Sequence, residues 1–226
     1  MRDVLSKKDY LLYQKILLPI DNQNLLNILN KADISFNELG SFSKEELEAN
    51  IREPYSLPEY MQKFINAFKE NEPIYPSLSW ENQLLSLFYD EVLQDKNEFI
   101  RNWYELDYNV KNILTGVLCK KHKMSLETQI IGNNDVAKTI KTSQSSDLGL
   151  TGIVDYIEDI INIAQNSNAI EREKAIDVFK WNYLNEMIFF EYFTIDRILT
   201  FVIKTNMIER WLKIDTQYGN ELFGML

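Results

Sequence analysis

The chain has 226 residues, a formal net charge of −10 and 45% hydrophobic residues, which is typical of a soluble globular protein that can bury its own core. Its one cysteine, Cys119, excludes an internal disulfide framework and a cysteine-rich zinc site, and its one histidine, His122, excludes sites that need several histidines. The acidic balance argues against nucleic acid as the main partner. No segment approaches the ~18 apolar residues of a membrane span, and the N-terminus lacks the apolar stretch of a signal peptide. We therefore expect a cytoplasmic protein.

Apolar residues recur every three or four positions along most of the chain, and no convincing run alternates apolar with polar residues. This pattern predicts an all-α fold without a β-sheet. The stretch 43–46 has the form of a capping box that begins a short helix. Prolines predict loops after it, over 53–58 and 73–79.

The middle and the C-terminal part carry the longest helical patterns. Apolar residues over 84–93 mark one helix face, and the stripe over 99–117 predicts a longer helix with Asn97 as its N-cap. The polar, glycine-containing stretch 142–152 predicts a surface loop or hinge. Residues 195–211 predict another long helix. We expect the tryptophans and the aromatic run before this helix, residues 189–193, mostly to pack between helices, with exposed members as possible anchors for a partner.

A weak internal repeat accompanies these helices. Asp21 and Asn24 precede two leucines, Asn109 and Asn112 stand in the same pattern, and Arg197 occupies the asparagine position of a poorer third copy. The copies recur about every 85 residues, which suggests related helical lobes rather than a short-period solenoid. We expect one all-α domain with lobes at roughly 1–79, 80–150 and 151–226.

Asn24 and Asn112 interest us because each lies beside core positions of an apolar helix. Asparagine lowers helix propensity, and burying its amide without a partner costs roughly 1–3 kcal/mol. We therefore expect each amide to bond a neighbouring helix or loop. A ligand contact is the alternative.

One carboxylate cluster, Asp155, Glu158 and Asp159, has the helical spacing with which one face could hold Mg²⁺, as in helical isoprenoid enzymes. Such enzymes need a second acidic motif, and the nearest candidate, Asn134 with Asp135, lacks the later carboxylate. Acidic residues early in a helix are favoured by its dipole, so we prefer a solvated helix N-terminus. A metal-dependent helical enzyme stays open as an alternative function.

A basic run, Lys120, Lys121, His122 and Lys123, stands out in this acidic chain. It suits a helix C-terminus, where cations oppose the dipole, and the three lysines are also a possible partner contact. Cys119 is expected in the core rather than as a reactive thiolate. The motifs of phosphate-binding loops, dinucleotide sites and hydrolase nucleophile elbows do not occur, so these activities lack sequence support.

Several stretches carry a resemblance that covers essentially the whole chain, with the C-terminal ones the most specific: 21–26, 109–114, 121–124, 131–132, 147–150, 189–199, 207–215 and 219–223. They resemble a bacterial family of uncharacterised proteins encoded with V-type ATPase subunits. That family is similar to the C/d-type subunit of V-type ATPases, which is named d in eukaryotes.

This resemblance implies three helical lobes arranged like a funnel, each with an Asp-x-x-Asn-[Leu/Ile] signature. Asp21 and Asn24 match the signature, whereas Asn109 replaces the aspartate of the second copy and Arg197 the asparagine of the third. These departures put a strict three-fold equivalence in doubt. The resemblance also implies a tyrosine-rich apolar segment before the present start, so we expect an N-terminally truncated chain.

By the same resemblance, the protein would have no catalytic, metal or cofactor residues. It would be a structural subunit or assembly factor that couples the central stalk of a V-type ATPase to the membrane rotor ring, and so serves proton or ion transport. Its partners would be the stalk and rotor-ring subunits, and it would lie at the inner membrane only through that complex. Its acidic charge would complement basic patches on a partner. A generic acidic helical adaptor is a further alternative.

Overall fold

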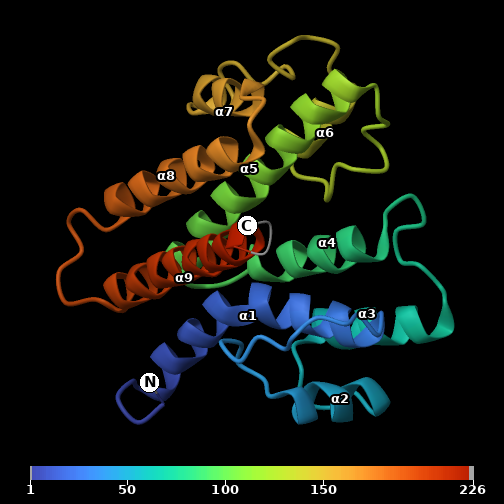
Figure 1. Cartoon of the computed structure of the whole chain (residues 1–226), viewed down its shortest axis with the longest axis vertical. Coiled ribbons are helices and arrows are strands. Elements are labelled where there is room, and N and C mark those ends of the chain that lie inside the picture. Colours follow the sequence, from blue (N-terminus) through green and yellow to red (C-terminus); the bar gives the residue numbers. More distant parts are fainter. Residues whose placement is uncertain (1, 224–226) are drawn as a thin grey trace. The chain divides into compact units, whose positions relative to one another are not determined.

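The structure is a computed structural model that describes residues 2–223, with side chains up to Lys213. This part of the chain is all-α and contains no strand, which confirms the predicted fold class (Figure 1). Its helices are α1 (Lys7–Leu29), α2 (Lys44–Arg52), α3 (Glu59–Glu70), α4 (Trp80–Val92), α5 (Glu98–His122), α6 (Asp135–Thr142), α7 (Ile157–Gln165), α8 (Ala169–Met187) and α9 (Ile195–Phe223).

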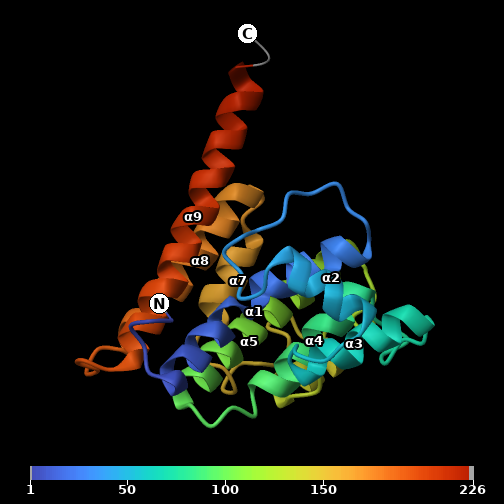
Figure 2. The same ribbon diagram turned by 90° about the horizontal axis from the view of Figure 1, so that it is seen from below.

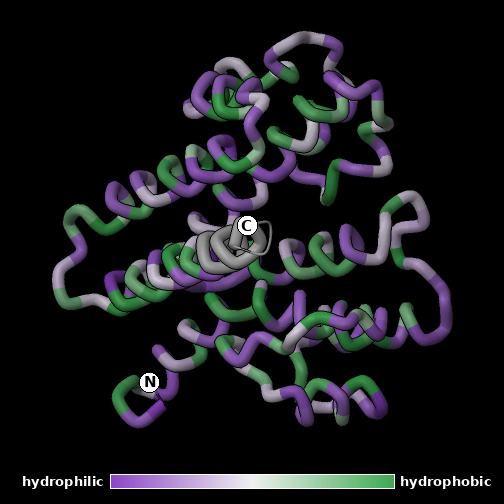
Figure 3. The backbone as a smooth tube through the Cα atoms, viewed as in Figure 1, coloured by the Kyte–Doolittle hydropathy of each residue, from purple (hydrophilic) through white to green (hydrophobic). Residues whose placement is uncertain are grey.

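The chain divides into two compact units. Unit 1 comprises Met1–Ile16 with Glu173–Leu226, and unit 2 comprises Leu17–Arg172. The three lobes expected from the sequence stay a prediction. Figure 3 shows hydrophobic and hydrophilic residues interspersed along the helices, and within the described part of the chain no helix is both long and apolar enough to cross a membrane.

Side-chain caps determine where several helices begin. Ser43 Oγ accepts from the amide of Glu46 at 3.2 Å, and the Glu46 carboxylate accepts from the Ser43 amide at 2.8 Å, so the predicted capping box is confirmed. Asn97 accepts from the amide of Ile100 at 2.9 Å, which confirms the predicted cap of α5. Each such cap contributes about 1 kcal/mol.

The two long helices α1 and α5 end in the same way. Lys31 and Lys123 follow them in the left-handed conformation, with φ of 52° and 55°. In each case the amide of the next residue donates to the carbonyl five positions earlier, at 2.9 Å. This closing pattern satisfies a helix carbonyl that would otherwise lack a partner.

An aromatic ladder crosses the core of unit 2, from α3 through α4 to α5. It consists of Tyr60, Phe88, Tyr89, Tyr104 and Tyr108, all buried. Phe88 is its hub, with ring centroids 5.6 Å from Tyr60, 5.1 Å from Tyr89 and 5.0 Å from Tyr104, and Tyr89 lies 4.8 Å from Tyr108. Tilted and edge-on aromatic pairs at such distances add about 0.5–1.5 kcal/mol each beyond area burial.

In unit 1, α8 and α9 run side by side as an antiparallel pair (Figure 2). In the middle of α8, Asp177 accepts from Trp211 Nε1 at 2.6 Å and pairs with Arg210. Near its end, Asn185 accepts from Lys204. Polar contacts at partly exposed positions thus help to join these helices.

Candidate interaction site

Two buried side chains of α1 hold the loop that follows the helix. Asn24 Nδ2 donates to the Asn37 carbonyl at 2.9 Å, and Asn24 Oδ1 accepts from the Asn37 amide at 3.0 Å. The Asp21 carboxylate accepts from the amide of Ser41 at 2.9 Å and from that of Phe42 at 3.2 Å. Because both polar atoms of the amide find backbone partners, burying Asn24 leaves no unmet hydrogen bond.

The same arrangement recurs on α5. Asn112 Nδ2 donates to the Ile131 carbonyl at 3.0 Å, and Asn112 Oδ1 accepts from the Ile131 amide at 3.1 Å. Asn109, three residues earlier, accepts at 2.8 Å from the side chain of Asn134, the N-cap of α6. We call these two arrangements the amide clamps. They confirm the expectation that Asn24 and Asn112 each bond a loop.

Each clamped loop contains one glycine beside its clamp, and sequence reasoning missed both. A Cβ on Gly40 would lie 2.2 Å from Asp21 Oδ1, and a Cβ on Gly132 would lie 1.8 Å from the hydroxyl oxygen of Tyr108. Gly132 also has a φ of +68°. The signal was available, since each glycine is the only one in its loop.

The third copy lacks an amide clamp. Arg197 Nε donates to the carbonyl of Glu191, which lies before α9, and the guanidinium lies 5.2 Å from the centroid of the Tyr192 ring. Arg197 thus holds the loop that precedes its helix. The equivalence of the copies extends to Asn24 and Asn112 and not to Arg197.

The carboxyl group of Asp21, beside the first clamp, has a strongly raised pKa. Burial raises its pKa to about 7, although hydrogen bonds from the Ser41 and Phe42 amides act to lower it. The nearby Glu46 carboxylate adds to the upward shift.

The basic run lies at the end of α5, as the helix-terminus interpretation predicted. Lys120 Nζ donates to the carbonyl of Ser145 and so fastens the loop after α6. Lys121 and Lys123 are exposed, and their contact with a partner stays a prediction. Cys119 is buried, and burial raises the pKa of its thiol, as expected for a core residue.

The acidic cluster lies at a solvated helix N-terminus, the interpretation preferred from the sequence, and its three carboxylates do not share one helical face. Helix α7 begins at Ile157, so Asp155 precedes the helix while Glu158 and Asp159 lie in its first turn. All three side chains are exposed. Among the described residues, no group of three or more His, Cys, Asp or Glu side chains could hold a metal ion. The first-turn carboxylates instead suit the helix dipole.

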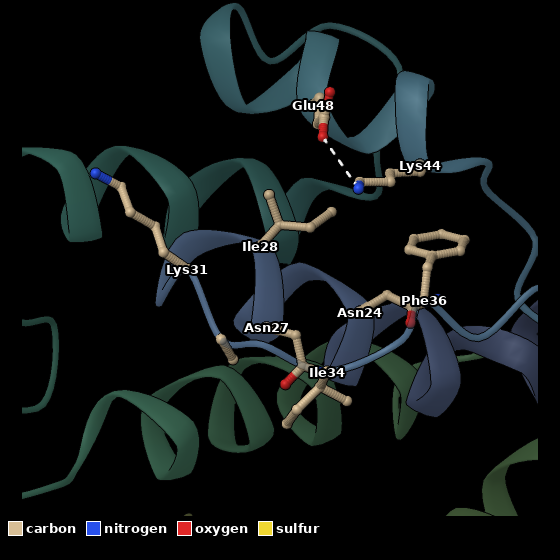
Figure 4. A pocket seen from close by; sticks show the side chains of 9 residues that line it. Asn24, Asn27, Ile28, Lys31, Ile34, Phe36, Lys44 and Glu48 are labelled. Carbon is tan, nitrogen blue, oxygen red and sulfur yellow. Dashed lines mark ion pairs between the residues drawn. The ribbon is translucent and has the colours of Figure 1, made fainter.

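A small groove lies beside Asn24 of the first clamp, between α1, the loop after it and α2 (Figure 4). Its volume is about 250 Å³. Figure 4 shows Ile28 and Phe36 on one side and, on α2, Lys44 paired with Glu48 at 4.0 Å. The groove is lined by Asn24, Asn27, Ile28, Lys31, Ala32, Ile34, Phe36, Lys44 and Glu48.

The aromatic run between α8 and α9 is exposed, so the expectation that it packs between helices is wrong. Phe190 is 81% exposed, and Phe193 is fully exposed with a φ of 60°. These residues lie in a turn and not in a helix, so the spacing that brings apolar residues to one buried helix face does not apply to them. A pocket of about 620 Å³ adjoins them in unit 1, lined by Leu5, Asp9, Tyr192, Phe193, Thr194, Ile195, Arg197 and Ile198.

Comparison with known proteins adds a family. No curated protein and no solved structure matches the chain. A family model described as "Protein of unknown function (DUF2764)" matches residues 1–226. Since this match spans the whole chain, the protein belongs to the DUF2764 family.

Proposed function

We propose that this DUF2764 protein is a non-catalytic structural subunit or assembly factor of a V-type ATPase, which couples the central stalk to the membrane rotor. The observation that carries the proposal is the repeated clamp. Asn24 and Asn112 make the same pair of bonds from a long helix to the loop that follows it. Related helical lobes built around such a signature are what the resemblance to the C/d-type subunit implies.

The way the loops are held also supports a mechanical role. Besides the clamps, Asn50 Oδ1 accepts from the amides of Tyr55 and Ser56 at 3.1 and 3.0 Å. Gln83 accepts from the Tyr75 amide at 3.1 Å and donates to the Leu78 carbonyl at 3.3 Å. A spacer that transmits torque needs loops that keep their conformation under load. Buried amides with both polar atoms bonded supply that stiffness.

The charge distribution supports binding to a basic partner. Residues 17–107 contain 17 acidic and 7 basic side chains, which accounts for the whole net charge of −10. An acidic region of this kind steers a basic partner towards it. In our proposal this partner belongs to the central stalk or rotor ring. The protein would then be peripheral to the inner membrane and act in proton or ion transport through the complex.

Co-purification tests the proposal. The affinity-tagged full chain, expressed from its own locus, is recovered from detergent-solubilised membranes and its companions are identified by mass spectrometry. We expect central-stalk and rotor-ring subunits, and we expect vesicles from a deletion strain to show reduced ATP-driven ion pumping that the gene restores. A permanent subunit would accompany the mature complex, and an assembly factor only incomplete complexes.

Recovery of other proteins without any ATPase subunit, together with full pumping in the deletion strain, would overturn the proposal. A generic acidic adaptor would then describe the protein better. The same strain expressing the tag alone is the control.

A further inference from the structure

We propose that two copies of this chain form a dimer through the aromatic run, residues 189–193, with Phe190 of each copy inserted into the pocket beside the aromatic run of the other. The run joins α8 to α9 at one end of that helix pair (Figure 2), and the pocket also belongs to unit 1. The inference concerns the free chain and does not rest on its binding to an ATPase, so it and the proposed function can fail separately.

The aromatic run exposes more apolar surface than a monomeric protein usually leaves in water. Its four rings, Phe189, Phe190, Tyr192 and Phe193, are all exposed, and the least exposed of them, Phe189, leaves 65% of its surface in water. An aromatic side chain buries about 150–250 Å², so the four rings together expose on the order of 600 Å². A stable interface covers about 800 Å² of each partner, whereas monomers rarely expose a contiguous apolar patch above roughly a few hundred Å². The four rings thus supply most of the area that a dimer needs.

The same surface offers a protruding side chain and a hollow next to each other. Phe190 is 81% exposed and stands two residues before Tyr192, which lines the pocket of about 620 Å³. Leu5, Ile195 and Ile198 supply apolar walls to this pocket. In a two-fold dimer every contact occurs twice, so an insertion that one copy makes is made in return by the other. A protruding ring beside an apolar pocket therefore suits a two-fold dimer.

The charges beside the pocket and beside the aromatic run are complementary. Lys7 and Lys8 directly precede Asp9 of the pocket lining, and both lysines are exposed. The aromatic run contains Glu191 and closely follows the exposed Glu186, and neither lysine nor arginine occurs in the run or between it and Glu186. In the proposed dimer the two carboxylates of one copy meet the two lysines of the other, which favours this pairing.

The charge of unit 1 as a whole also favours a second copy as the occupant. Residues 1–16 and 173–226, which form unit 1, contain ten acidic and ten basic side chains, so the net charge of −10 belongs to unit 2. Two copies that meet through unit 1 therefore bring together surfaces without net charge. An anionic lipid surface is a poorer partner, because segments that bind it combine aromatic residues with lysine or arginine.

Contacts within unit 1 hold the aromatic run in place. Arg197 Nε donates to the carbonyl of Glu191, and the Arg197 guanidinium lies 5.2 Å from the centroid of the Tyr192 ring. The rings of Phe189 and Phe190 meet edge-on, with centroids 4.8 Å apart. A segment that is fixed before association loses little conformational freedom when the dimer forms.

Sedimentation velocity of the full chain over a wide range of micromolar concentrations tests the proposal. We expect a concentration-dependent dimer. Phe190→Ser should raise its dissociation constant by about tenfold or more, because the inserted ring is lost. Tyr55→Ser is the control, since Tyr55 is an exposed aromatic residue in unit 2, and it should change the constant by less than about twofold. Thermal unfolding by circular dichroism verifies that both variants fold.

A charge exchange tests the pairing of the two copies. Lys7→Glu with Lys8→Glu should raise the dissociation constant by about tenfold, and so should Glu186→Lys with Glu191→Lys, because like charges then meet across the contact. All four substitutions in one chain should restore most of the association, since opposite charges meet again. The control, Lys96→Glu with Lys138→Glu, alters the net charge as the first pair does but at exposed lysines of unit 2, and should have little effect.

A chain that stays monomeric at every concentration would overturn the proposal, as would equal effects of Phe190→Ser and Tyr55→Ser. Failure of the fourfold variant to associate better than the two double variants would also overturn it. Vesicles of phosphatidylcholine with phosphatidylglycerol are the remaining probe, and we expect no flotation of the chain with them. Flotation of a monomeric chain that Phe190→Ser abolishes would assign the aromatic run to lipid and overturn the proposal.

Discussion

At the scale of single residues, buried polar atoms decide where the chain after a helix goes. Asn24 and Asn112 each use both amide atoms on one loop residue, so the loop is fixed in position and in direction. Their neighbour Asn22 is different. Its Oδ1 accepts from the Tyr60 hydroxyl at 2.8 Å, while its buried Nδ2 has no hydrogen-bond partner in the structure. An asparagine inside a helix therefore does not always bond the loop that follows. It does so only where its side chain lies beside that loop.

We expect Asn112→Leu and Asn24→Leu each to destabilise the protein by about 1–3 kcal/mol, because each leaves the amide and carbonyl of a loop residue without partners. Urea unfolding measures the effect. Asn102→Leu is the control, since Asn102 lies half-exposed on the same helix as Asn112. Unchanged stability in both clamp variants would contradict the structural role. Partner binding that falls at unchanged stability would make the motif a contact surface instead.

The second prediction at this scale concerns pH. Native Asp21 has a pKa of about 7, above its ordinary value of 3.8, so between these values the folded protein binds more protons than the unfolded chain. Its contribution to stability is therefore present at low pH and is lost as the pH rises towards 7 and beyond. We expect wild type to lose stability between pH 5 and 7.5 relative to Asp21→Asn. Parallel stability curves for the two proteins in urea would refute this.

At the scale of elements, the sequence predicts features that depend on residues close together in the chain, such as helix caps. It does not predict contacts between separate elements. The caps Ser43 and Asn97 could be predicted because a cap bonds an amide only three residues away. The start of α7 could not, because acidic residues at 155–159 fit a helix that begins at either end of that stretch. The groove was also unpredictable, since its walls meet only once the clamp has folded the loop towards α2.

The aromatic ladder makes a prediction at the scale of elements, because it joins three helices through one hub. Phe88→Leu and Tyr104→Leu should be coupled by about 0.5–1.5 kcal/mol in a double-mutant cycle, since their edge-on contact exists only when both rings are present. The free energies of unfolding of the four proteins measure this. A cycle of Phe88→Leu with Ile153→Ser, whose side chain is 54% exposed, should be additive. A coupling near zero in the first cycle would show that the rings merely fill space.

At the scale of the whole molecule, the two units are built from different kinds of contact. In unit 2, α5 alone buries twelve residues, many of them aromatic or aliphatic, and clamps fix its loops. In unit 1, α8 buries only Ile176 and Leu184 and the described side chains of α9 bury Leu199, Val202 and Ile203, while partly exposed pairs such as Arg210 with Asp177 also join the two helices. Partly exposed ion pairs contribute little to stability, usually under about 1 kcal/mol. The two units should therefore differ in how readily they open.

We expect this difference in native-state hydrogen exchange. Amides of α4 and α5 should exchange only through global unfolding. These helices can open only after the contacts between their buried aromatic rings and the hydrogen bonds of the clamp on α5 are lost. Amides of α8 and α9 should exchange through a smaller opening that leaves unit 2 folded, since α8 buries only Ile176 and Leu184 and partly exposed ion pairs help to hold the two helices. Raising the salt concentration should accelerate exchange in α8 and α9 by screening their ion pairs and leave α5 nearly unchanged. If all four helices instead exchange with the same free energy and respond alike to salt, the protein unfolds as one cooperative unit.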